Sequence, residues 1–159
     1  MAATARVQVN MTISFKHINL DDVENLMSIE TLCHSHPWTH KTFSSCIGGR
    51  YFGEYAQLDD RILGFYIGEH VAGEATLMDI CITTDLQGHG YGKTLLLRFF
   101  EQSKLLNNNC IWLEVRSKNI SAQMLYINQG FTETGRRTGY YPSASGFGYE
   151  DAIIMKKRL

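Results

Sequence analysis

Apolar residues recur along this chain with two periods, one typical of strands and one typical of helices. Residues 111–116 alternate between Ile, Leu or Val and other side chains, which predicts a strand with one face in the core. Residues 91–106 repeat apolar positions at helical spacing, which predicts an amphipathic helix. The core face of that helix carries Leu96, Phe99, Phe100 and Ser103.

The same periods, with capping and turn residues, predict the other elements. Asn19, Thr39 and Asn119 are suited to begin helices, and Gly130 is suited to end one. Strands are expected at 13–18, 51–57, 62–66, 74–83, 111–116, 131–137 and 151–157, and helices at 20–32, 40–47, 91–106 and 120–128. Helices mixed with several hairpins predict an α/β fold with a mixed sheet, not a doubly wound parallel one.

Length and composition indicate one domain. The chain has 159 residues, of which 44% are hydrophobic, enough for a single core over residues 11–159. Residues 1–10 lack the apolar segment of a signal peptide and are expected to be an N-terminal extension without a structural role. A net charge of −1, without a long basic run, gives no support for nucleic-acid binding.

Two further features predict where the protein works. No apolar run approaches the ~18 residues of a membrane span. The four cysteines form no C-x-x-C pair, which is typical of buried free thiols in a reducing compartment. We therefore expect a cytoplasmic protein that contacts neither membrane nor nucleic acid, and we expect it to be a monomer.

The run Gln87–Thr94 holds three glycines between a predicted strand and a predicted helix, an arrangement suited to binding a pyrophosphate. A P-loop requires glycine where Gln87 stands. A dinucleotide fingerprint requires its third glycine at position 93, not at Gly92. The pattern Q/R-x-x-G-x-G/A is met by Gln87, Gly90 and Gly92, although a plain turn before a helix remains an alternative.

The remaining motifs narrow this choice, because with the glycine run they resemble the GNAT family of N-acetyltransferases over roughly residues 13–157. The specific resemblance is to the bacterial branch that acetylates the N-terminal alanine of a small-subunit ribosomal protein. It rests on Pro37-Trp38, residues 74–77 (EATL), 113–116 (LEVR), Asn119 with Leu125-Tyr126 and Gly130-Phe131, Tyr140-Tyr141-Pro142, and 150–155 (EDAIIM). It implies a central, mostly antiparallel twisted sheet with helices on both faces.

The resemblance also implies acetyl-CoA as co-substrate. Backbone groups near Ile80, Cys81 and Ile82 would pair with its pantetheine arm, and Asn119 would contact it as well as capping a helix. The pyrophosphate would lie on the glycine run, whose residues are Gln87, Gly88, His89, Gly90, Tyr91, Gly92 and Lys93. Relatives often have two basic residues where this chain has Gly88-His89.

Two side chains are candidates for proton transfer in a direct attack of the amine on the thioester, within a ternary complex. By resemblance, Glu114 is the base; a pair with Arg116 or Lys118 on a solvated face is the alternative. By resemblance, Tyr126 is the acid, since a phenol can protonate a departing thiolate; a core aromatic at helical spacing is the alternative.

The substrate of the resembling branch is the N-terminal segment of a ribosomal protein. Glu74, Tyr140 and Tyr141 are candidates to contact it, and Asp79 is another acidic candidate, although each fits an ordinary strand or packing role. This chain is longer than its relatives between Pro142 and Glu150, in a region expected to touch the peptide.

Two questions of function stay open at this point. A lysine side chain, a polyamine or an antibiotic could replace the peptide amine, and a non-catalytic acetyl-CoA-binding module would not need Glu114 or Tyr126. Cys33, His34, His36 and His40 resemble a metal cluster in composition, but their spacing does not fit zinc, and no metal is expected.

Overall fold

A computed structural model describes residues 12–159, so the extension expected at 1–10 lies outside the described residues. Seven strands and four α-helices follow one another in the predicted order. They are β1 (Ser14–His17), α1 (Val23–Cys33), α2 (His40–Ser45), β2 (Tyr51–Leu58), β3 (Arg61–Val71), β4 (Glu74–Ile82), α3 (Tyr91–Leu105), β5 (Cys110–Arg116), α4 (Ile120–Asn128), β6 (Thr132–Pro142) and β7 (Tyr149–Arg158). Short 3-10 turns at Leu20–Asp22 and Thr84–Leu86 complete the order.

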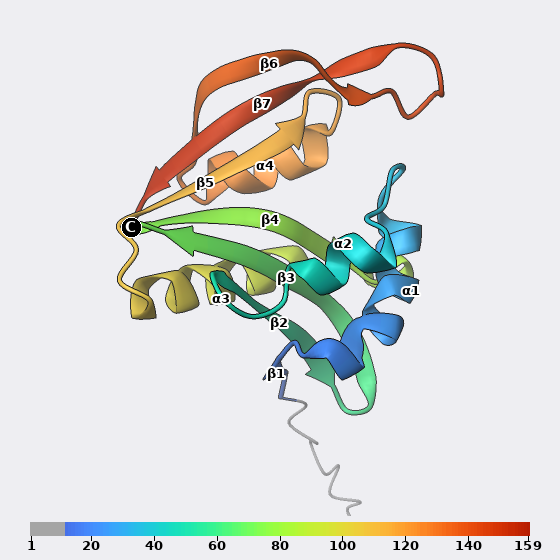
Figure 1. The fold of residues 1–159 in the computed structure, drawn as a ribbon, viewed down its shortest axis with the longest axis vertical. Coiled ribbons are helices and arrows are strands. Elements are labelled where there is room, and N and C mark those ends of the chain that lie inside the picture. Colours follow the sequence, from blue (N-terminus) through green and yellow to red (C-terminus); the bar gives the residue numbers. More distant parts are fainter. Residues whose placement is uncertain (1–11) are drawn as a thin grey trace, which may run out of the picture.

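Among the described residues the strands form one sheet in the order β1-β2-β3-β4-β5-β7-β6, in which only the β4–β5 pair is parallel. That pair is short, because Glu74–Leu77 face Cys110–Leu113 and no later residues of the two strands pair with each other. Figure 1 shows β4 and β5 parting from this shared end. The mixed, mostly antiparallel sheet confirms the predicted fold class.

A bulge lies where β4 leaves β5. Ile67 of β3 is opposite Asp79, but Gly68 is opposite Leu77, so Met78 has no residue opposite it on β3. An extra residue of this kind bends the strand that carries it and increases its twist. The bend therefore accounts for the direction in which β4 turns away from β5.

Figure 1 shows helices on both faces of the sheet. Apolar side chains form one core on the face covered by α1 and α2 and a second core on the face covered by α3 and α4. Phe65 and Ile67 of β3 face α1 and α2, whereas Tyr66 between them packs against Phe99 of α3. Tyr66 also donates a 2.6 Å hydrogen bond to buried Glu54, which Arg98 of α3 contacts through two further hydrogen bonds. This network connects β2 and β3 to α3.

No helix among residues 12–159 is long and apolar enough to cross a membrane.

The predicted caps are confirmed. Asn19 forms a reciprocal capping box with Asp22, and Thr39 accepts a hydrogen bond from the Thr42 N–H. The Asn119 side chain accepts from the Ala122 N–H at 3.1 Å, and Gly130 has a φ of 93° at the end of α4.

Three strands were predicted too short. β3 runs from Arg61 to Val71. The prediction ended it too early because residues 63–68 are buried on both faces of the sheet and therefore show no alternation of apolar and polar residues. β6 continues to Pro142, and β7 already begins at Tyr149. β6 is an exposed edge strand with register shifts, so its sequence has no apolar alternation from which its length could be predicted. Tyr140 and Tyr141, expected in a loop, therefore belong to the end of a strand.

Candidate active site

A cleft of about 780 Å³ opens where β4 and β5 part. Its walls come from the unpaired ends of these two strands, the glycine run, α4 and the end of β6. Of the predicted site residues it brings together Ile80, Ile82, Gln87, Gly88, Gly90, Tyr91, Gly92, Lys93, Glu114, Asn119, Tyr126 and Tyr141. Residues widely separated in sequence thus form one surface, beside the short parallel pair.

The glycine run forms an anion-binding turn at the start of α3. Gly88 and Gly90 have φ values of 79° and 84°, which other residues rarely adopt, and Gly90 is the N-cap of the helix. The backbone N–H groups of residues 88–93 have no hydrogen-bond acceptor among residues 12–159. A row of free N–H groups at the positive end of a helix dipole is suited to a phosphate group.

The inner edge of β4 supplies unpaired backbone groups to the same cleft. Ile80 and Ile82 line it, and the neighbouring Cys81 points away into the core beneath α1. Because β5 no longer pairs with this part of β4, an extended ligand can hydrogen-bond to the strand as an added strand would. Gln87 supports the edge by donating a hydrogen bond to the Ile82 carbonyl at 3.1 Å.

Glu114 and Tyr126 approach the cleft from β5 and α4. The Glu114 side chain is 27% exposed and forms a 2.7 Å ion pair with Arg137 of β6, not with Arg116 or Lys118 as the alternative had it. Tyr126 is 6% exposed and packs edge-on against Phe131. Burial and the nearby charge of Asp79 raise the pKa of the Tyr126 phenol, so it stays protonated at neutral pH.

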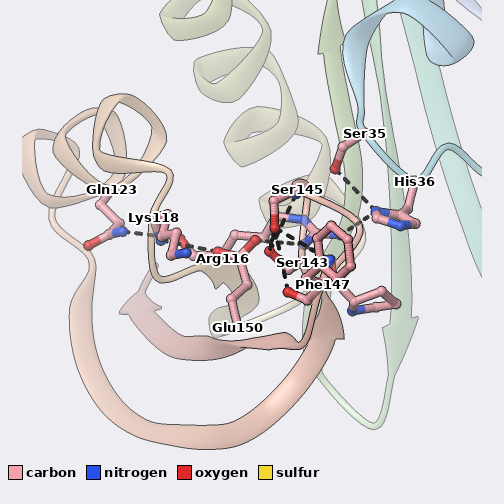
Figure 2. Close-up of polar contacts among 10 residues, drawn as sticks. Ser35, His36, Arg116, Lys118, Gln123, Ser143, Ser145, Phe147 and Glu150 are labelled. Carbon is pink, nitrogen blue, oxygen red and sulfur yellow. Dashed lines mark hydrogen bonds and ion pairs between the residues drawn. The ribbon is translucent and has the colours of Figure 1, made fainter.

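Arg116 holds the mouth of the cleft together (Figure 2). It donates 2.8 Å hydrogen bonds to the Pro142 carbonyl and to Glu150, and its guanidinium lies over the Tyr141 ring. Although burial of Glu150 opposes its charge, the hydrogen bonds from Arg116 and the Lys118 N–H hold the pKa of this carboxyl below its usual value. The mouth is thereby fixed to β5, which positions Tyr141 in the wall.

Four predicted site residues do not line the cleft. Glu74 lies at the closed end of β4, where it accepts a hydrogen bond from the Trp112 indole. Cys81 is directed into the core, His89 hydrogen-bonds to the Leu86 and Gln87 carbonyls on the outside of the turn, and Tyr140 stacks under Arg137. The geometry gives Glu74 and Tyr140 no contact with the cleft.

A cluster of ionisable side chains lies at the floor of the cleft, and the sequence pattern did not reveal it. Glu30 and Cys33 of α1, with His34 at its C-cap, meet Asp79 and Cys81 of β4. Burial and Asp79 raise the pKa of Glu30 to about 8. Burial works against the His34 cation, but the hydrogen bond to Asp79 raises the pKa of His34 to about 9.

His34, His36 and His40, which resemble part of a metal cluster in composition, do not come together in the structure. His36 contacts Ser35 and Arg116 at the mouth, and His40 begins α2. The partners of His34 are separated from it by as many as 47 residues. Only the Glu-x-x-x-His spacing at Glu30 and His34, one helical turn, could have signalled any part of the cluster.

Comparison with known proteins agrees with this geometry. The family profile described as Acetyltransferase (GNAT) family matches residues 23–131. The ribosomal protein bS18-alanine N-acetyltransferase of Salmonella typhimurium is 38% identical over 138 residues, which cover 87% of this chain and 92% of that protein. The protein of the same name from Haemophilus influenzae is 41% identical over 134 residues, covering 84% and 90%.

A solved structure extends the likeness to three dimensions. The crystal structure of the ribosomal-protein-S18-alanine N-acetyltransferase from Escherichia coli has a TM-score of 0.88 to this chain at 34% identity, covering 93% of this chain and 94% of that one. The parted strands, the glycine turn and these matches lead to one conclusion. The chain belongs to the GNAT family of acetyltransferases.

Proposed function

We propose that this protein transfers the acetyl group of acetyl-CoA to the α-amine of an N-terminal alanine on ribosomal protein bS18. The observation that carries the proposal is the match to proteins of that name, at 38% and 41% identity over nine-tenths of their length. The cleft supports it, because it joins an anion site to a groove with free strand edges.

The chain's own residues suit acetyl-CoA. The free N–H groups of residues 88–93 would hold the pyrophosphate, and the inner edge of β4 at Ile80 and Ile82 would hold the pantetheine arm. Asn119 stands at the opposite wall, at the start of α4. Acetyl-CoA would supply the activated thioester, and these residues would hold it in the cleft between β4 and β5.

Glu114 is the proposed base. Arg137 holds its carboxylate by a 2.7 Å ion pair, which leaves the second oxygen for the amine or for one bridging water. A peptide α-amine has a pKa of about 7.7–8.0, so roughly a tenth of it is already neutral at pH 7. A lysine amine, at about 10.4, is far harder to deprotonate. One half-buried carboxylate is therefore matched to an N-terminal amine.

Tyr126 is the proposed acid. Its hydroxyl has no hydrogen-bond partner among residues 12–159, and its ring lines the cleft. The burial that raises the pKa of this phenol also makes a thiolate in the same place more basic. The phenol proton can thus pass to the departing sulfur when the thioester bond breaks.

The test is intact mass after incubation with acetyl-CoA and synthetic peptides. One peptide carries the bS18 N-terminal sequence with its alanine free, and a second has that α-amine blocked and an internal lysine. A gain of one acetyl group on the first peptide alone supports the proposal. A gain on the second peptide alone would reassign the enzyme to lysine side chains, and no gain on either would refute peptide acetylation.

A further inference from the structure

Four metal-ligating side chains converge beneath the cleft from two elements that are distant in sequence. Glu30 lies in the last turn of α1 and His34 follows directly as the C-cap of that helix, and Asp79 and Cys81 share one face of β4. Their ligating atoms all lie within 4.8 Å of one another. We propose that Glu30, His34, Asp79 and Cys81 form a structural zinc site at the floor of the cleft.

The distances between these atoms fit one central ion. A zinc tetrahedron with arms of about 2.0–2.3 Å has edges of about 3.3–3.7 Å. His34 Nε2 lies 2.8 Å from Asp79 Oδ1 and 3.7 Å from Glu30 Oε2. Cys81 Sγ lies 3.1 Å from Glu30 Oε2, 3.1 Å from His34 Nε2 and 3.7 Å from Asp79 Oδ1. Two of these five distances lie within that range and three are shorter, so an ion at the centre would move the side chains slightly apart.

Hydrogen bonding alone accounts poorly for this arrangement. The Cys81 thiol has one proton but three electronegative neighbours within 3.7 Å. The Asp79 side chain is only 5% exposed, and its buried Oδ2 atom has no hydrogen-bond partner among residues 12–159. A buried carboxylate oxygen without a partner is costly, and a cation at the cluster would offset that cost.

The surroundings of the cluster meet the other requirements of a metal site. Glu30 Oε1 accepts a 3.0 Å hydrogen bond from the Trp38 N–H, which orients the carboxylate. The His34 side chain is 39% exposed and lines the cleft, which gives an ion a path from solvent. Four protein ligands fill the tetrahedral coordination sphere of zinc and leave no position for a water molecule. The ion would therefore connect the end of α1 to β4 and would not activate water.

Metal binding by the whole protein tests this proposal. After dialysis against EDTA, the protein is titrated with Zn²⁺ against a chromophoric chelator, and with Co²⁺ by absorbance. We expect one equivalent of either ion, a thiolate-to-cobalt charge-transfer band, and a higher Tm with Zn²⁺. Cys81→Ala should remove the band and weaken Zn²⁺ binding by at least about 100-fold.

Two further variants keep the test decisive. His34→Ala changes a part-exposed side chain and so leaves the core packed, yet it should weaken zinc binding as strongly as Cys81→Ala. Cys46→Ser changes a buried cysteine of the neighbouring α2 region outside the cluster and should bind zinc like the unaltered protein. No stoichiometric zinc uptake, or equal uptake by the protein and its His34→Ala variant, would overturn the proposal.

Discussion

Replacing Tyr126 by phenylalanine removes one oxygen atom from the cleft and leaves almost everything else in place. The ring packs against Phe131 with 5.8 Å between centroids, and phenylalanine preserves that contact. The hydroxyl has no hydrogen-bond partner among the described residues 12–159, so its loss leaves no buried group unpaired. The folded state should therefore keep its stability.

The expected effect is on turnover. General acid catalysis contributes about 10²–10⁴-fold, which corresponds to about 2.7–5.4 kcal/mol of barrier. We expect kcat to fall by that factor, while the Kd for acetyl-CoA changes by less than about twofold, because the phenol acts on the leaving sulfur and does not anchor the cofactor. Coenzyme A release with a thiol reagent measures kcat, and calorimetry measures the Kd.

Tyr66→Phe is the matched control. That hydroxyl donates a 2.6 Å hydrogen bond to buried Glu54, away from the cleft. Its loss should lower the free energy of unfolding by about 1–3 kcal/mol and leave kcat unchanged well below the Tm. The reasoning fails if Tyr126→Phe keeps kcat within twofold of the unaltered enzyme, or if its loss of activity follows a comparable loss of stability.

Three other predictions follow from the structure. Glu114→Gln should move the acidic limb of the kcat/KM profile to higher pH, since the amine must then lose its proton unaided; an unchanged profile would remove Glu114 as base. Arg98→Ala leaves buried Glu54 without its cation and should cost about 3–5 kcal/mol in urea unfolding, whereas Arg50→Ala, which breaks an exposed pair, should cost less than about 1 kcal/mol. In the metal-free protein, His34 and Glu30 have pKa values raised from 6.5 to about 9 and from 4.5 to about 8, so the folded state binds more protons and stability should fall as pH rises from about 4.5 to about 9. Thermal melts across that window check this, and a stability that rises with pH would contradict it.

Local signals in the sequence were enough to predict most of the helices and strands. The helix caps at Asn19, Thr39 and Asn119 depend on residues three positions apart. The core face of α3 is formed by apolar residues that recur at helical spacing within that one helix. Such interactions are complete within a few residues, so a single sequence contains them.

Interactions between distant elements were not visible in the same way. Glu114 pairs with Arg137, which lies two strands away across β7, whereas spacing along the chain offered only its neighbours Arg116 and Lys118 as alternative partners. The cluster of His34 with Asp79 and Cys81 depends on how α1 packs on the sheet. Neither contact has a sequence period, because each is set by tertiary packing.

The parting of β4 from β5 has a consequence for aggregation. A sheet normally has two edges, and unpaired edges attract strands of other chains. This sheet has two further edges, but they face each other inside a cleft walled by α4 and the glycine turn. A strand with side chains on both faces would have to displace those walls, whereas a thin unbranched ligand would not. The fold thus leaves these backbone groups unpaired inside a cleft, and not on an outer edge where a strand of another chain could add to the sheet.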